Sequence, residues 1–128
     1  MAQILIVDDD PSIGGLLFEL LRNRGFEAQI ATDGQKALEA LHEMKPLPSV
    51  ILLDLVMPVM NGWQFRRAQL QEPELASVPV IVLSATVTFE SDISELRADG
   101  FLRKPVAVEK LFELVSSVCE RSSAPPAS

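Results

Sequence analysis

Five short apolar runs, each followed by a stretch with helical periodicity, limit the folds that this chain of 128 residues can adopt. Most of these runs are nearly continuous in apolar residues, as expected for strands buried on both faces of a parallel sheet. The runs lie at Gln3–Val7, Glu27–Ala31, Val50–Leu53, Val80–Leu83 and Phe101–Arg103. Strands that alternate with helices form parallel sheets covered by helices on both faces. The pattern therefore predicts an α/β fold of five βα units.

Apolar stripes with spacings of three and four residues predict the helices between these strands. The stripes comprise Ile13, Leu16, Leu17, Leu20 and Leu21; then Ala37, Leu38, Leu41 and Met44; and finally Val108, Leu111, Phe112, Val115 and Val118. Weaker helical patterns cover Gly62–Leu70 and Glu90–Ala98.

Residues typical of helix ends flank these stripes. Asp10 is expected to cap the first helix, with Pro11 at its first position, and Asp33 to cap the second. Gly25 and Gly100 are expected to follow helix ends, because glycine adopts the left-handed conformation there without strain.

Composition and charge exclude several classes of protein. With 48% hydrophobic residues, 23% charged residues and a net charge of −7, the chain is typical of a globular domain and unsuited to binding nucleic acid. No apolar stretch reaches the length of about 20 residues that spans a bilayer, and the N-terminus lacks the pattern of a signal peptide. We expect a cytoplasmic domain over residues 1–121, with residues 122–128 as a disordered tail or the start of a linker.

The rarest side chains offer little catalytic chemistry. Cys119 is the only cysteine, which excludes a disulfide within the chain, and it is expected to be buried. His42 is the only histidine and is expected at the surface, so the sequence provides no histidine-based catalysis or built-in phosphodonor. Met57 and Trp63 are expected to pack loops and helices.

Polar residues follow the predicted strands where each strand ends. They are Asp8, Asp9 and Asp10 after the first strand, Asp54 after the third, Ser84 after the fourth and Lys104 after the fifth. Because functional residues of an open parallel sheet gather at the carboxyl ends of its strands, we expect these side chains to converge. Clustered carboxylates have raised pKa values unless a cation neutralises them. Ligands that offer only oxygen favour a hard ion, and Mg²⁺ fits best.

Asp54 is a lone carboxylate within the apolar sequence ILLDLVMPVMNG, residues 51–62. A carboxylate beside Mg²⁺, a hydroxyl and a lysine can accept a phosphoryl group and form an acyl phosphate. Lys104 and Ser84 would then stabilise charge on the transferring oxygens together with the metal. The apolar residues that flank Asp54 are expected to pack the loop that positions it.

Four motifs in order make the chain similar to a known family. They are ILIVDDD, DLVMPVMNG, VLSA and the Lys-Pro of LRKP. Over residues 3–121 the sequence resembles the receiver domain of bacterial two-component response regulators, and ATDGQKAL resembles the start of the second helix of that family. The resemblance implies a flavodoxin-like, doubly wound (βα)5 sandwich with strand order 2-1-3-4-5.

The resemblance also implies roles for the acidic residues. Asp54 would be the phosphoacceptor and a metal ligand, Asp9 a direct ligand of Mg²⁺, and Asp8 a ligand acting through water. The backbone carbonyl of Val56 would also bind the metal.

Further residues match positions that, in the family, control the conformational change on phosphorylation and the lifetime of the phosphorylated state. Ser84 and Phe101 match the hydroxyl and aromatic switch pair, although some members have Tyr where this chain has Phe101. Lys104 precedes a proline that is cis in the family. Val56 and Thr86 match positions that flank the path of the hydrolytic water, and neither is expected to assist that water, so we expect slow loss of phosphate.

The implied function is that of a phosphoacceptor in a phosphorelay. A sensor histidine kinase or a histidine phosphotransfer protein would phosphorylate Asp54. The changed surface would comprise the fourth helix (Glu90–Ala98), the fifth strand and the fifth helix, and would act on a downstream protein, a fused output domain or a second copy of the chain as a homodimer. The domain would be no enzyme beyond its own phosphorylation and dephosphorylation. The sequence does not identify its kinase or its output.

Two alternatives remain open at this point. Asp8 and Asp10 have the spacing of the nucleophile and general acid in haloacid-dehalogenase-like phosphohydrolases. That assignment needs acidic ligands after Lys104, where only glutamates of the last helix follow, and it leaves Asp54 without a role. The second alternative is a pseudo-receiver that is a scaffold for a partner without being phosphorylated.

Overall fold

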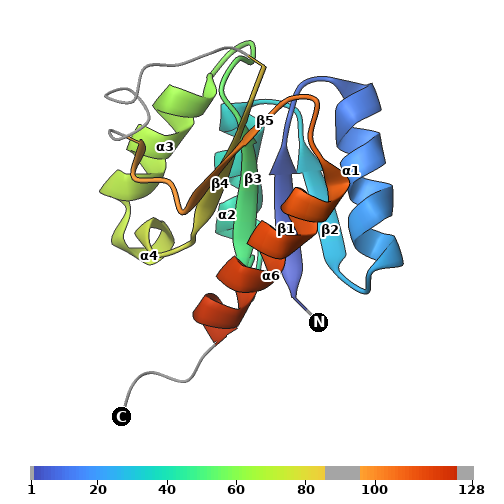
Figure 1. The fold of residues 1–128 in the computed structure, drawn as a ribbon. Helices are drawn as coiled ribbons and strands as arrows, with labels where there is room; N and C mark the ends of the chain where they lie inside the picture. Colours follow the sequence, from blue (N-terminus) through green and yellow to red (C-terminus); the bar gives the residue numbers. More distant parts are fainter. Residues whose placement is uncertain (1, 86–95, 124–128) are drawn as a thin grey trace.

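The computed structural model describes residues 2–85 and 96–123, and for residues 121–123 only the backbone. Figure 1 shows the elements with the labels used below. In chain order they are β1 (Gln3–Val7), α1 (Pro11–Asn23), β2 (Glu27–Ala31), α2 (Gly34–Glu43), β3 (Val50–Asp54), α3 (Gly62–Gln71), α4 (Pro73–Ala76), β4 (Val80–Ser84), β5 (Gly100–Arg103) and α6 (Val108–Ser123). Thr86 and most of the helix expected at Glu90–Ala98 lie outside the described residues.

The strands form one sheet in which every neighbouring pair is parallel. Their order is β2-β1-β3-β4-β5, which confirms the predicted α/β fold and its strand order. Helices α1 and α6 cover one face of the sheet, and α2 and α3 cover the other (Figure 1).

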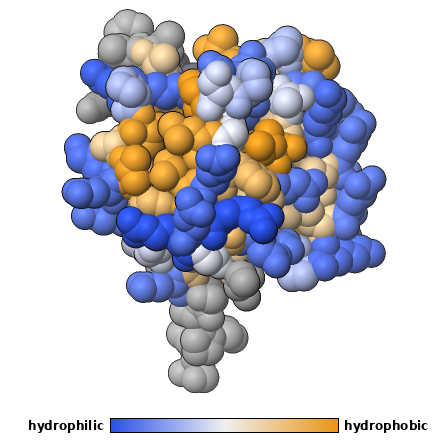
Figure 2. All heavy atoms as spheres, turned by 90° about the vertical axis from the view of Figure 1, so that its right-hand side faces the viewer, coloured by the Kyte–Doolittle hydropathy of each residue, from blue (hydrophilic) through white to orange (hydrophobic). Residues whose placement is uncertain are grey.

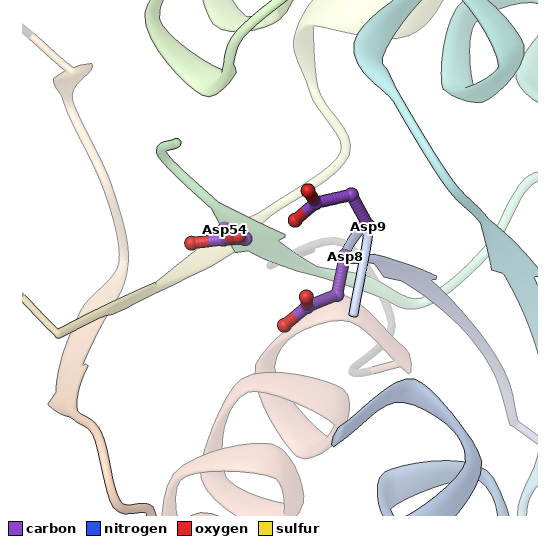
Figure 3. Close-up of side chains that lie close together, drawn as sticks. All are labelled: Asp8, Asp9 and Asp54. Carbon is purple, nitrogen blue, oxygen red and sulfur yellow. The ribbon is translucent and has the colours of Figure 1, made fainter. Parts of the chain in front are cut away.

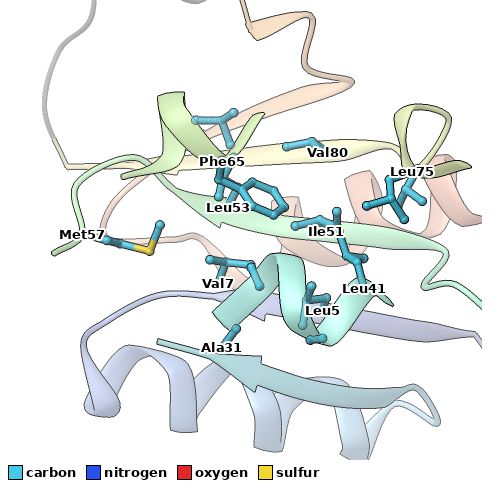
Figure 4. Close-up of a cluster of buried hydrophobic side chains, with 14 of the residues drawn as sticks. Leu5, Val7, Ala31, Leu41, Ile51, Leu53, Met57, Phe65, Leu75 and Val80 are labelled. Atoms are coloured by element: carbon cyan, nitrogen blue, oxygen red, sulfur yellow. The ribbon is translucent and has the colours of Figure 1, made fainter. Parts of the chain in front are cut away.

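Alternate residues of the strands build two separate cores, because successive side chains of a strand point to opposite faces. Leu5 and Val7 of β1 lie in the core under α2 and α3, which Figure 4 shows. Ile4 and Ile6 lie in the core under α1 and α6. All residues of the central strands β3 and β4 are buried, which is why these strands are continuous apolar runs.

The two central strands end one residue later than predicted. Asp54 pairs with Leu83, and Ser84 pairs with Arg103, so both functional candidates belong to the strand ladder itself. The sheet hydrogen bonds therefore fix the backbone of both residues, which a loop position would not do.

Both predicted helix caps are confirmed. The Asp10 side chain accepts a hydrogen bond from the backbone N–H of Ser12 at 2.9 Å, and Asp33 accepts one from Lys36 at 2.8 Å. Gly25 follows α1 with a φ of 89°, in the left-handed region that favours glycine.

The prediction that Gly100 follows a helix end is wrong. Gly100 is the first residue of β5 and pairs with Ile81, so the chain is already extended there. The left-handed residue is Arg97, with a φ of 50°, immediately after the helical residue Leu96.

Two residues of the predicted apolar stripes are exposed. The buried stripe of α1 comprises Gly14, Leu17 and Leu21. Leu16 lies about 100° around the helix from Leu17 and is 57% exposed. Val108 is exposed at the start of α6, while the rest of its stripe is buried.

Helix α3 buries two polar residues that its weak helical pattern did not predict. The Arg66 guanidinium donates hydrogen bonds to the carbonyls of Leu96 and Arg97 at 2.8 and 2.9 Å, and to Gln69 Oε1 at 2.8 Å. Gln69 in turn donates to two carbonyls of the segment before β4, those of Leu75 and Val78. This network joins α3 to the segments that precede β4 and β5.

Candidate functional site

Three carboxylates meet at the carboxyl edge of the sheet (Figure 3). Asp8 and Asp9 follow β1, and Asp54 ends the neighbouring strand β3. Ligand oxygens of the three residues all lie within 4.8 Å of one another. Strand β1 lies between β2 and β3, and the chain continues from β1 to β2, away from β3. The cluster therefore lies at the point where the strand order reverses, which is where open parallel sheets bind their ligands.

Asp10 lies outside this cluster, although it directly follows Asp9. Its side chain caps α1 by accepting from Ser12, and the residue is exposed. The haloacid-dehalogenase alternative requires Asp10 beside the nucleophile as general acid. In the structure Asp10 has a helix-capping role instead.

Lys104 reaches the same site from the end of β5. Its ammonium lies 2.9 Å from Asp8 Oδ2 and 3.5 Å from Asp54 Oδ1, and its side chain is largely buried. The Lys104 backbone N–H donates to the Ser84 carbonyl at 2.9 Å, which aligns the ends of β5 and β4. The Lys104–Pro105 peptide bond is cis, as the resemblance implies.

The charges of the site shift two pKa values. Burial raises the pKa of Asp54 above its usual value, and the Asp8 charge raises it further; the Lys104 charge and the Val56 N–H oppose this rise. Burial by itself would lower the pKa of Lys104, but the hydrogen bond to Asp8 and the charges of Asp54 and Asp8 outweigh it and raise that pKa. Burial thus disfavours the ionised form of Asp54, and nearby positive charge favours it.

Gly62 explains the Asn-Gly pair of the DLVMPVMNG motif. A Cβ atom on Gly62 would clash with the Asp54 carbonyl oxygen and lie 2.8 Å from Leu55 Cα. The Gly62 N–H donates to the Leu55 carbonyl at 3.0 Å, and Asn61 caps α3 in a capping box with Gln64. Only glycine lets α3 begin this close to the backbone of Asp54.

The residues that flank Asp54 differ in burial. Leu55 and Met57 are buried, in agreement with a packing role in the loop. Val56 is 67% exposed, so the expectation that it packs the loop is wrong. Loop residues next to a strand end point alternately inward and outward, so only two of these three side chains reach the core. The Val56 amide nitrogen lies 3.5 Å from Asp54 Oδ1.

The expected switch pair lies on neighbouring strands. Ser84 is buried at the end of β4. Phe101 of β5 pairs with Val82 and is partly buried against the core under α2 and α3. Ser84 directly follows Leu83, the ladder partner of Asp54, whereas Phe101 lies one strand further from Asp54. Thr86 lies outside the described residues.

Comparison with known proteins identifies the family. Residues 4–116 match the model of the response regulator receiver domain. The chain belongs to this family. This receiver domain is 35% identical over 127 residues to the DNA-binding response regulator MtrA of Mycolicibacterium smegmatis. It is 34% identical over 130 residues to a CpxR homologue of Haemophilus influenzae, a transcriptional regulatory protein.

These matches cover 98% of the receiver domain but 54% and 53% of the two relatives. The chain thus spans about half the length of the curated relatives it matches. Among solved structures, the Vibrio cholerae chemotaxis response regulator CheY4 shares 31% identity with a TM-score of 0.83, covering 92% of this chain and 98% of CheY4. A Francisella receiver domain shares 27% identity with a TM-score of 0.84, covering 96% of this chain and all of that one.

Family membership favours one of the functions that the sequence left open. The chain is a response regulator receiver domain of the two-component type, a signalling domain rather than a typical enzyme. Neither the phosphohydrolase nor the pseudo-receiver alternative is better supported than a receiver that accepts a phosphoryl group. None of the helices in the described ranges has the length and apolarity needed to cross a bilayer.

Proposed function

We propose that Asp54 accepts a phosphoryl group from a phosphohistidine of a sensor histidine kinase or a histidine phosphotransfer protein. The observation that carries this proposal is the position of Asp54. It is a buried carboxylate at the last ladder position of β3, with a lysine at 3.5 Å and two further carboxylates around it.

The reaction exchanges one bond to phosphorus for another. A carboxylate oxygen of Asp54 attacks phosphorus while the bond from phosphorus to the donor nitrogen breaks. The leaving imidazole keeps the bonding electrons, and a proton on its other ring nitrogen, present before the transfer or taken up from solvent, leaves the ring neutral. Lys104 would stabilise negative charge on the transferring oxygens, and the Ser84 hydroxyl would donate to the same group of oxygens.

The acidic cluster fits Mg²⁺ as the cofactor. Its donors are all oxygens, their separations are compatible with one ion, and the exposed Asp9 leaves the site open to solvent. Asp8, Asp9, Asp54 and the Val56 carbonyl would hold the ion. Bound there, Mg²⁺ would neutralise charge that the carboxylates and the phosphoryl oxygens bring together.

Labelling with a small phosphodonor tests the proposal. With phosphoramidate and Mg²⁺, the wild type should gain one phosphoryl group that hydroxylamine removes, and chelation should prevent the gain. Asp54→Ala should abolish labelling, while Asp10→Asn, which keeps the helix cap, should retain it. Equal labelling of Asp54→Ala would exclude Asp54 as the acceptor. Absence of labelling in the wild type would favour the pseudo-receiver, and turnover of phosphate monoesters would favour the phosphohydrolase.

The phosphorylated domain would signal through a surface next to the site. Phosphate on Asp54 would draw the Ser84 hydroxyl inward and let Phe101 turn, biasing an existing equilibrium between two states. The surface that responds would comprise Glu90–Ala98, β5 and α6. Since the relatives are named as DNA-binding or transcriptional regulators, we propose an output of that kind, fused or separate, or a phosphorylation-dependent homodimer, acting in the cytoplasm.

Amide hydrogen exchange with and without beryllofluoride tests this switch. Protection should change between Ser84 and Leu111. Changes confined to α1 and α2 would refute the assignment.

A further inference from the structure

The first residue of α2 touches the loop that follows the phosphoacceptor. The Gly34 N–H donates a hydrogen bond to the Met60 carbonyl at 2.9 Å. A Cβ atom on Gly34 would lie 2.8 Å from that carbonyl oxygen and 2.7 Å from Met60 Cγ. Both separations are well below van der Waals contact, and one of the two atoms belongs to the backbone. Gly34 thus permits a close approach that any side chain would prevent.

The loop in question, residues 55–61, connects Asp54 with α3 and contains Val56. It is closed by backbone hydrogen bonds from Gly62 to Leu55 at 3.0 Å and from Met60 to Pro58 at 2.7 Å. These bonds tie Met60 and Gly62 to Pro58 and Leu55, the residues that bracket Val56. We therefore expect a displacement at Met60 to be passed on to the Val56 carbonyl.

The burial of the two partners decides which one would yield to a side chain at position 34. Helix α2 is fixed in the core by Ala37 and Leu41, both almost completely buried. The loop is buried at Leu55 and Met57, but it is exposed at Val59, which is 81% exposed, and Met60 itself is only partly buried. Moving the part of the loop around Met60 costs fewer buried contacts than moving α2, so this part of the loop would shift.

We propose that Gly34 is a positioning residue for the phosphoryl-transfer site. By carrying no side chain, it lets α2 hold the Met60 carbonyl and so fixes the loop whose Val56 carbonyl would bind Mg²⁺. This inference rests on the proposed function. It assigns a role in the site to a residue on another helix that does not touch the carboxylates.

Calorimetric titration with Mg²⁺ tests the proposal on intact protein. Gly34→Ala should bind Mg²⁺ about tenfold more weakly, the effect typical of residues that orient metal ligands. It should keep the circular dichroism of the wild type and acquire phosphate from phosphoramidate more slowly at subsaturating Mg²⁺. The matched control is Gly15→Ala in α1, where an added Cβ meets no atom within 4 Å. Gly15→Ala should leave Mg²⁺ affinity unchanged and raise Tm by about 3 °C.

Substitution of Met60 separates the backbone contact from side-chain packing. Met60→Ala keeps the carbonyl and should bind Mg²⁺ within about twofold of the wild type, because the loop is still held by its backbone. The double variant Gly34→Ala/Met60→Ala should remain weak. Restored affinity in the double variant, or an equal loss in Met60→Ala, would overturn the proposal. Wild-type affinity in Gly34→Ala would overturn this inference alone, whereas a wild type that binds no Mg²⁺ would overturn the proposed metal site as well.

Discussion

Lys104 Nζ donates a hydrogen bond to Asp8 Oδ2 at 2.9 Å, although the two residues are 96 positions apart in the chain. The same ammonium lies 3.5 Å from Asp54 Oδ1. The single charge of Lys104 therefore offsets part of the negative charge of two of the three carboxylates of the candidate metal site. A bound cation would compete with Lys104 for Asp8, whereas phosphoryl oxygens would be attracted to it. Lys104 should thus oppose metal binding and favour phosphoryl transfer.

Lys104→Met should separate these two effects. We expect Mg²⁺ affinity to rise about fivefold, because a competing charge is removed. Phosphorylation by phosphoramidate at saturating Mg²⁺ should slow by about a hundredfold, because the transferring oxygens lose a donor. Calorimetry and intact-mass kinetics measure the two quantities. Arg103→Met, which removes an exposed charge next to Lys104 in the sequence, is the control and should change both by less than about twofold. A parallel fall of affinity and rate in Lys104→Met would contradict this prediction.

Asp54→Asn should stabilise the fold near neutral pH. Burial raises the pKa of Asp54, so between its unfolded and folded pKa values the native state binds the proton more tightly. Stability therefore falls as the pH rises through this interval, and the loss is complete above the folded pKa. Asn removes that loss and should increase the free energy of unfolding at neutral pH.

Urea unfolding at neutral and acidic pH measures the difference between the wild type and Asp54→Asn. The gain should shrink as the pH falls from the folded pKa of Asp54 towards its unfolded value, and it should be absent below about pH 4, where both states are protonated. Asp9→Asn, which changes an exposed carboxyl of the same cluster, should have a smaller effect. A less stable Asp54→Asn at neutral pH would show that the attraction of Lys104 outweighs the burial of the charge.

Arg66→Ala should destabilise the fold strongly. The substitution leaves the carbonyls of Leu96 and Arg97 and the amide oxygen of Gln69 without their donor. Because buried acceptors without partners are costly, we expect the free energy of unfolding to fall by about 2–4 kcal/mol. Arg67→Ala is the matched control: the neighbouring arginine is exposed, and its loss should stay within about 0.5 kcal/mol. Chemical unfolding measures the stability of both variants. Equal stabilities of Arg66→Ala and Arg67→Ala would refute the role of Arg66 in joining α3 to the segment before β5.

Val56→Asn should shorten the life of the phosphorylated state by roughly tenfold, equivalent to about 1.4 kcal/mol of barrier. Val56 is exposed beside Asp54, where an amide could hold the attacking water in line with phosphorus. Val59→Asn changes an exposed valine of the same loop and should leave the lifetime unchanged. Because Val59 has a φ of 66°, which asparagine tolerates better than valine, this control should also be slightly more stable. Phosphate loss followed by intact mass compares the three proteins; equal half-lives of Val56→Asn and the wild type would exclude a shielding role of Val56.

The sequence by itself determined the strands, the order in which polar residues follow them, and the helix caps at Asp10 and Asp33. These features are local: apolar runs specify buried strands, and capping depends on residues within one turn. Convergence of Asp8 and Asp54 followed from the same information, since parallel strands bring their carboxyl ends to one edge. The strand order itself came from the resemblance to a family, because apolar patterns do not encode which strands are neighbours.

Only the tertiary structure decided the contacts between elements. The closer approach of Lys104 to Asp8 than to Asp54 depends on how β5 aligns with the other strands. Burial of Arg66 depends on two carbonyls supplied from 30 and 31 residues away. The close approach of Gly34 to Met60 depends on the packing of α2, which precedes β3, against the loop 55–61, which follows β3. Each of these contacts joins segments distant in the chain, and their strength is set by desolvation and packing distance, which no local pattern of residues records.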